Sequence, residues 1–121
     1  MSAFRAIPIH IHGALEVVAA PLLLVAPFAL GFSTPLGVLS FGLGVLLIGL
    51  GLSVDDQGER GSLPLNAHAG FDYLLAAITI AAGAVAGLVA DDFAATVFLV
   101  GFGSAHLALT ASTRFSRPLG A

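Results

Sequence analysis

The chain has 121 residues, of which 58% are hydrophobic and only 9% are charged. This composition is too apolar for a water-soluble domain of this size, so a lipid bilayer is the expected solvent. The absence of cysteine excludes disulfides, thiolate metal sites, iron–sulfur clusters and cysteine nucleophiles. The net charge is −3, with four arginines and no lysine. Nucleic-acid binding is therefore excluded, because no basic face can neutralise a run of phosphates.

Three uncharged runs are long enough to cross hydrocarbon, which takes roughly 18 to 20 apolar residues. They cover residues 17–54, 73–90 and 93–113, and the first is long enough for two passes. We therefore predict an all-α membrane protein, a four-helix bundle with transmembrane helices at about residues 8–30, 35–53, 64–90 and 93–113. A cleavable signal peptide is not expected, because no small-residue cleavage site precedes a polar mature domain.

Prolines mark the helix starts. Proline suits a first helical turn, where its missing N–H is not needed, and three predicted helices begin with one: Pro8, Pro35 and Pro64. Asp92 has the side chain of a helix N-cap and precedes the fourth helix. Pro21 and Pro27 fall inside the first helix and predict a bend there.

The arginines predict the orientation. Four helices place the N-terminal region, the loop between the second and third helices and the C-terminal tail on one side of the membrane. All four arginines lie in these segments: Arg5, Arg60, Arg114 and Arg117. The positive-inside rule makes that side cytoplasmic, so both termini are expected in the cytoplasm.

The two halves of the chain resemble each other. Shifting the sequence by 56 positions places His12 over His68 and Glu16 over Asp72. We interpret the chain as one transmembrane domain over residues 1–121, made of two tandem two-helix repeats related by an axis along the membrane normal. The expected parts are repeat 1 at about 7–53, a polar cytoplasmic loop at 54–63, repeat 2 at about 64–113 and a short C-terminal tail at 114–121.

The start of each half also resembles a known repeat. Ile7-Pro8-Ile9-His10-Ile11-His12-Gly13-Ala14-Leu15-Glu16, followed by Ala26-Pro27-Phe28-Ala29-Leu30-Gly31-Phe32, is similar to the repeat of the bacterial SPW-repeat membrane proteins. Ala26 and Phe28 replace the Ser and Trp of that signature. In the second half His68, Asp72 and Tyr73 fit, whereas Ala82-Gly83-Ala84 stands where the Pro-aromatic part would lie. The resemblance implies a small multi-pass protein of the bacterial inner membrane and brings no biochemical activity with it.

Three histidines and two carboxylates lie well inside the predicted spans: His12, Glu16, His68, Asp72 and His106. Each of the first two histidines precedes a carboxylate by four residues, so the pair shares one helical face. At a rise of about 1.5 Å per residue, all five fall in the cytoplasmic half of the membrane. Because the repeat axis brings the first and third helices together at equal depth, we predict one intramembrane polar cluster of these residues.

Several roles are open to this cluster. It can be structural, with buried hydrogen bonds that dock the two repeats. It can relay protons or ions, although the outer half of the bundle offers no ionisable residue to continue a path. Two histidines and two carboxylates also suit a zinc or iron ion, and two histidines at matched depth suit a haem. His10 is expected at the level of the lipid headgroups.

The leading hypothesis is a structural or accessory membrane protein without catalysis of its own. No nucleophile with a base, phosphate-binding loop or metalloprotease motif is present. No catalytic, cofactor or metal residue is therefore assigned, and the expected partners are the lipid bilayer and either a second copy of the chain or a larger membrane complex. The alternative is a proton- or metal-linked transporter, or a cofactor-binding membrane protein, that uses the five-residue cluster.

Overall fold

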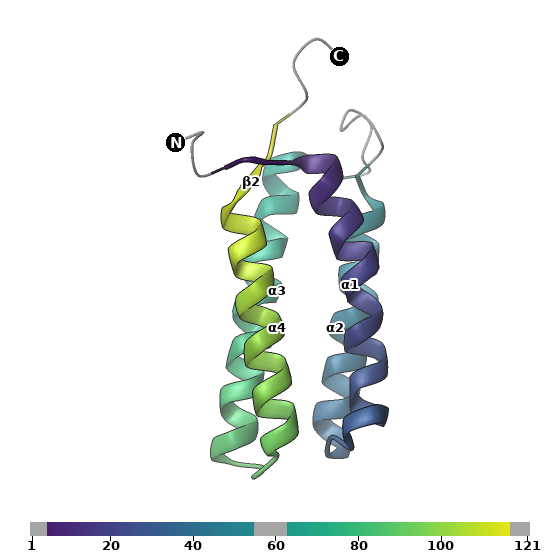
Figure 1. Ribbon diagram of the computed structural model, residues 1–121, viewed down its shortest axis with the longest axis vertical. Helices are drawn as coiled ribbons and strands as arrows, with labels where there is room; N and C mark the ends of the chain where they lie inside the picture. Colours follow the sequence, from purple (N-terminus) through teal and green to yellow (C-terminus); the bar gives the residue numbers. More distant parts are fainter. Residues whose placement is uncertain (1–4, 55–62, 117–121) are drawn as a thin grey trace.

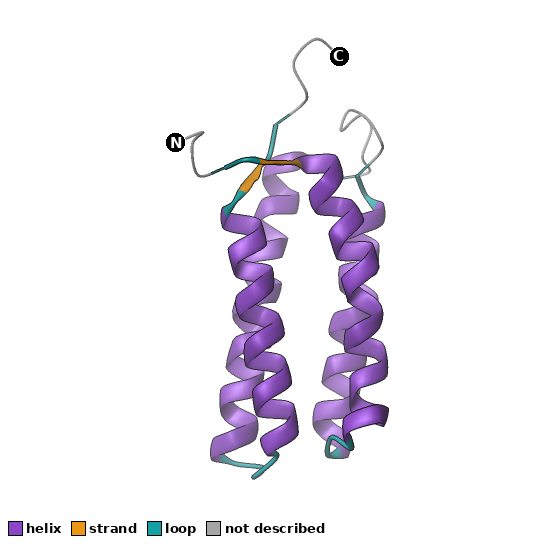
Figure 2. Cartoon of the chain, in the orientation of Figure 1, coloured by secondary structure: helices purple, strands orange, loops and turns teal. Residues whose placement is uncertain are grey.

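The computed structural model describes residues 5–54 and 63–116 of the chain. Within these residues the fold is helical except for two strands of two residues each (Figure 2). The elements are β1 (Ile7–Pro8), α1 (Ile9–Leu30), α2 (Thr34–Leu52), α3 (Leu65–Leu88), α4 (Phe93–Ala111) and β2 (Thr113–Arg114). The polar loop predicted at 54–63 lies outside the described residues except at its two ends, and so do Arg60 and Arg117.

The four predicted helices are confirmed, and each is long and apolar enough to cross a membrane. Large apolar side chains cover the outside of the bundle. Among the most exposed, at 74% to 86% of their surface, are Val18, Phe28, Leu88 and Phe93. A water-soluble bundle would bury such side chains, whereas hydrocarbon accepts them, so this is a multi-pass membrane protein.

The helices form two antiparallel hairpins, α1 with α2 and α3 with α4, that stand side by side (Figure 1). Glycines allow the close approach within each hairpin. A Cβ added at Gly44 would lie 3.0 Å from the Cβ of Leu23 on α1, and one added at Gly103 would lie 3.0 Å from the backbone N of Ile80 on α3. Helix contact in lipid depends on such small residues, because no hydrophobic effect drives helices together there.

Helix α1 stays continuous through its two prolines. Pro27 cannot donate the N–H that would otherwise bond the carbonyl of Leu23. The hydroxyl of Ser40 on α2 donates to that carbonyl instead, at 2.7 Å. The helix ends at Gly31, whose left-handed φ of 69° lets its N–H return to the carbonyl of Pro27. In lipid such replacement hydrogen bonds are required, because no water is available to satisfy a free carbonyl.

The ends of the described chain meet at one end of the bundle (Figure 1). Strand β1 pairs in parallel with β2, with Ile7 opposite Thr113, and the N–H of Ile7 donates to the carbonyl of Ser112 at 3.0 Å. The expectation that the fourth helix runs to residue 113 is therefore wrong by two residues, because the backbone after Ala111 turns out of the helix to pair with β1.

Asp92 joins the two hairpins at the opposite end. It caps α4, as predicted, with Oδ1 accepting the N–H of Ala95 at 3.1 Å. Its Oδ2 accepts the N–H of Ser33, in the turn between α1 and α2, at 2.8 Å. These two backbone donors favour the charged carboxylate and hold the pKa of Asp92 below its ordinary value.

We expect Asp92→Asn to lower the stability of the bundle by about 1 kcal/mol, the usual cost of one lost hydrogen bond. A lowered folded-state pKa adds stability above the unfolded pKa of about 3.9 and loses it as the pH falls through the folded value. The gap in melting temperature between wild type and variant, measured in detergent, should therefore be constant at neutral pH and shrink below about pH 4. Asp91→Asn is the matched control, because Asn tolerates the φ of 51° at this exposed position. Equal losses in the two variants would contradict the Ser33 link.

Candidate functional site: a buried histidine–carboxylate cluster

The structure brings all five predicted polar residues together at the end of the bundle where the chain ends meet. The two histidine–carboxylate pairs, His12 with Glu16 and His68 with Asp72, lie in the first turns of α1 and α3. His106 lies in the last turns of α4. All five are buried, with exposures of 0% or 1% for four of them and 6% for His106. His10, two residues before His12, is exposed and takes no part.

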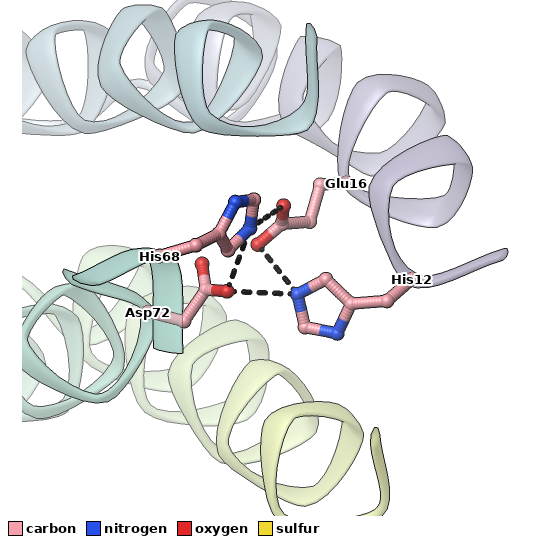
Figure 3. Close-up of side chains that lie close together, drawn as sticks. All are labelled: His12, Glu16, His68 and Asp72. Carbon is pink, nitrogen blue, oxygen red and sulfur yellow. Dashed lines mark hydrogen bonds and ion pairs between the residues drawn. The ribbon is translucent and has the colours of Figure 1, made fainter. Parts of the chain in front are cut away.

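The Nε2 atoms of His12 and His68 both face the two carboxylates (Figure 3). His12 Nε2 lies 2.8 Å from Asp72 Oδ2 and 3.0 Å from Glu16 Oε2. His68 Nε2 lies 3.0 Å from Asp72 Oδ2 and 3.2 Å from Glu16 Oε1. Each imidazole therefore contacts the carboxylate of its own helix and that of the other hairpin.

His106 supplies a third imidazole to the same carboxylates. Its Nε2 lies 3.0 Å from Glu16 Oε2 and 3.2 Å from Asp72 Oδ1. The Oδ1 atom is the Asp72 oxygen that His12 and His68 do not contact. All four carboxylate oxygens thus have a partner, which is what burial of two ionisable acids in lipid requires.

The other ring nitrogen of His12 and of His68 is held by a hydroxyl. His12 Nδ1 lies 2.7 Å from the Oγ1 of Thr113 in β2, and His68 Nδ1 lies 3.1 Å from the Oγ of Ser53, just after α2. Each hydroxyl gives its single proton to a backbone carbonyl, Thr113 to Leu109 and Ser53 to Leu50, both at 2.6 Å. The hydroxyls must therefore accept from the imidazoles, which assigns a proton to Nδ1 in both histidines.

This assignment decides what lies between Nε2 and the carboxylates. A neutral imidazole with its proton on Nδ1 presents a lone pair at Nε2, and a lone pair facing an anionic oxygen at about 3 Å is repulsive. A proton or a metal cation must therefore lie between them. Protons on both Nε2 atoms would make two imidazolium–carboxylate pairs with no net charge, a balance that suits burial in hydrocarbon.

Phe115 closes the cluster at the end of the bundle. Its ring, just after β2, lies 5.2 Å from the ring of His12 and 6.0 Å from that of His68, measured between centroids. Pairing of β1 with β2 therefore brings two groups to the site, the hydroxyl of Thr113 and the ring of Phe115. Both shield the imidazoles from the aqueous side.

Four possible ligand atoms lie close enough together to bind one metal ion. One atom each from His12, Glu16, His68 and Asp72 lies within 4.8 Å of the other three. A haem is a poor fit, because both Nε2 atoms contact the same oxygen of Asp72, and this carboxylate fills the space that the planar cofactor would need.

A groove of about 530 Å³ runs between α1 and α4 on the lipid-facing side of the cluster. It is lined mainly by apolar side chains, such as Leu15, Leu22 and Phe102, and also by Glu16 and His106. Such a lining suits hydrocarbon chains better than water. The groove does not supply the polar path that movement of an aqueous ion would require.

Comparisons of this chain with protein-family models, with curated proteins and with solved structures gave no match. The resemblance to the SPW-repeat proteins therefore stays a prediction.

Sequence reasoning missed Ser53, Thr113 and Phe115. The two hydroxyl residues have one recognisable signal, since each follows the last apolar turn of its hairpin and so reaches the depth of the histidines. Hydroxyl residues are nevertheless common at helix ends, and rotation about the helix axis cannot be read from so uniform an apolar surface. The position of the Phe115 ring depends on the β1–β2 pairing, and a strand of only two residues has no recognisable sequence signature.

Thr113→Val should destabilise the protein by about 1–3 kcal/mol, because it leaves the Nδ1–H of His12 buried without an acceptor. Thermal unfolding in detergent measures this loss, and ¹⁵N spectra of the imidazoles report the Nδ1 proton directly. The matched control is Thr110→Val, the same change one helical turn earlier.

Thr110 Oγ1 is buried without a partner among the described residues, so its removal should leave stability unchanged or increase it. Two variants with equal effects, or spectra that place the His12 proton on Nε2 alone, would contradict the assigned network.

Proposed function

We propose that this chain is a structural or accessory protein of the bacterial inner membrane, without catalysis of its own, in which the polar cluster locks the two hairpins into one unit. One observation carries this proposal: most hydrogen bonds of the cluster cross from one hairpin to the other. His12 bonds Asp72 and Thr113, and both partners belong to the α3–α4 half. His68 bonds Glu16 and Ser53, which belong to the α1–α2 half.

The proposal includes the repeat and the orientation. Gly44 packs against α1 much as Gly103 packs against α3, and His12 and His68 have matching partners, which supports two copies of one hairpin. Arg5 and Arg114 are both exposed and lie at the same end of the bundle, which supports cytoplasmic termini under the positive-inside rule. As a structural or accessory protein, the chain would bind a second copy of itself or a larger membrane complex.

A double-mutant cycle across the hairpins tests the lock. His12→Ala and Asp72→Ala should each cost about 3–5 kcal/mol, because each leaves buried polar partners unpaired. The double variant should be more stable than the sum of the two losses predicts, by about 0.5–3 kcal/mol. Stability is measured by unfolding in detergent.

His10→Ala combined with Asp72→Ala is the control cycle, because His10 is exposed on the same helix. If the double variant loses the sum of the two single losses in unfolding free energy to within about 0.5 kcal/mol, His12 and Asp72 are independent sites. That result would argue against the lock.

A proton-linked transporter is the second candidate, favoured only by the burial of three histidines with two carboxylates. From Val17 to Val54 and from Leu74 to Ala90 no side chain is ionisable, so a path beyond the cluster lacks titratable steps. We therefore expect purified protein in liposomes to move protons no faster than empty liposomes. A flux that disappears in Glu16→Gln/Asp72→Asn, but persists in Asp91→Asn, would favour the transporter instead.

A further inference from the structure

We propose that His12, His68, Glu16 and Asp72 form a binding site for one divalent transition-metal ion, with zinc as the ion that fits best. The ligands would be the Nε2 atoms of the two histidines and one oxygen from each carboxylate. This goes beyond the docking of the hairpins, because a hydrogen-bonded lock requires no cation.

The protonation of the histidines is the first argument. The hydroxyls of Thr113 and Ser53 hold the proton on Nδ1 and turn the Nε2 lone pairs toward the centre of the cluster. Metal-ligating histidines have this arrangement, with the second ring nitrogen donating to an oxygen that fixes the tautomer and the ring orientation.

The spacing of the donor atoms is the second argument. Metal–ligand bonds of about 2.0–2.1 Å in a tetrahedral site place neighbouring ligand atoms about 3.3 Å apart. The contacts between Nε2 atoms and carboxylate oxygens measure 2.8 to 3.2 Å. These contacts use both oxygens of Glu16, and one donor atom from each of the four side chains lies within 4.8 Å of the other three. No pair of donor atoms therefore has to move by more than about 1.5 Å to reach the spacing of ligands around one ion. Figure 3 shows the four groups converging on a common centre.

Charge balance is the third argument. Two neutral imidazoles, two carboxylates and one divalent cation sum to zero, which is the least costly state for a site buried in hydrocarbon. Binding would displace the two protons that otherwise lie between the Nε2 atoms and the carboxylates, so the charge of the site is the same with and without the ion.

His106 acts as a positioning residue in this arrangement. Its Nε2 contacts Asp72 Oδ1, whereas His12 and His68 contact Oδ2. It can thus orient the Asp72 carboxylate while Oδ2 binds the metal. The N₂O₂ donor set without sulfur suits Zn²⁺ and also accepts Fe²⁺, Mn²⁺ or Co²⁺.

The test begins with wild-type protein purified in mild detergent without a polyhistidine tag. Elemental analysis should find about one transition-metal ion per chain. After removal of the ion by a chelator, Co²⁺ added alone should bind with about 1:1 stoichiometry and give the visible spectrum of a four-coordinate ion. X-ray absorption of the zinc-loaded protein should show nitrogen and oxygen neighbours, including imidazole.

Ligand variants locate the site. His12→Ala and Asp72→Asn should weaken Co²⁺ binding at least 10-fold, whereas His10→Ala and Asp91→Asn, both at exposed positions, should leave it unchanged. Thr113→Val keeps every ligand and loses only the partner of His12 Nδ1. It should weaken binding about 10- to 100-fold, the usual effect of removing a hydrogen bond to a metal-ligating histidine.

The wild-type measurements decide the proposal even if the ligand variants fail to fold. Purified protein that contains no stoichiometric metal, and that stays folded without binding Co²⁺ or Zn²⁺ at millimolar concentration, would overturn it. Metal binding that survives in folded His12→Ala and Asp72→Asn would overturn it as well. Neither result affects the hairpin lock, which is judged separately by the double-mutant cycle on metal-free protein.

Discussion

The constraint on which this structure depends is the burial of two carboxylates and three imidazoles inside an apolar, membrane-spanning helix bundle. Each group would be costly alone, because lipid offers no hydrogen-bond partner and little dielectric screening. They are tolerable only together, when their charges cancel and their polar atoms pair. Because Glu16 lies on one hairpin and Asp72 on the other, this condition can be met only when the hairpins stand at one relative height. The polar cluster thereby sets the register of the whole bundle.

The smaller features of the fold serve this register. Each hairpin is held internally by glycine-mediated contact, which fixes the helix pair but not its position beside the other pair. The β1–β2 pairing brings Thr113 over His12 at one end, and Asp92 reaches Ser33 at the other. Polar ties at both ends and apolar packing between them therefore position the hairpins along their full length. A sliding movement of one against the other would break the ties at both ends.

The sequence predicted the helices and the polar cluster well, because polar residues are rare in this chain and each one stands out. Long uncharged runs predicted the four helices to within a few residues, and the spacing of His12 with Glu16 and of His68 with Asp72 predicted their shared faces and depth. What it could not provide was helix rotation, because these helices are apolar on all sides and carry no strong face. The contacts of Ser53, Thr113 and Phe115 depend on that rotation and on a two-residue strand pair. The orientation in the membrane and the family resemblance remain predictions.

His106 is the member of the cluster that the proposed repeat does not account for. The offset of 59 residues that relates Gly44 to Gly103 places His106 over Leu47, and both side chains line the groove between α1 and α4. Two exact copies would give a symmetric set of two histidines and two carboxylates. His106 departs from such a set, because it bonds both carboxylates and the corresponding position of the first half is Leu47. It fixes the Asp72 oxygen that the other histidines do not contact, and so leaves Oδ2 directed at His12 and His68. His106 therefore orients the carboxylates, whereas His12, Glu16, His68 and Asp72 supply the centre toward which their polar atoms point.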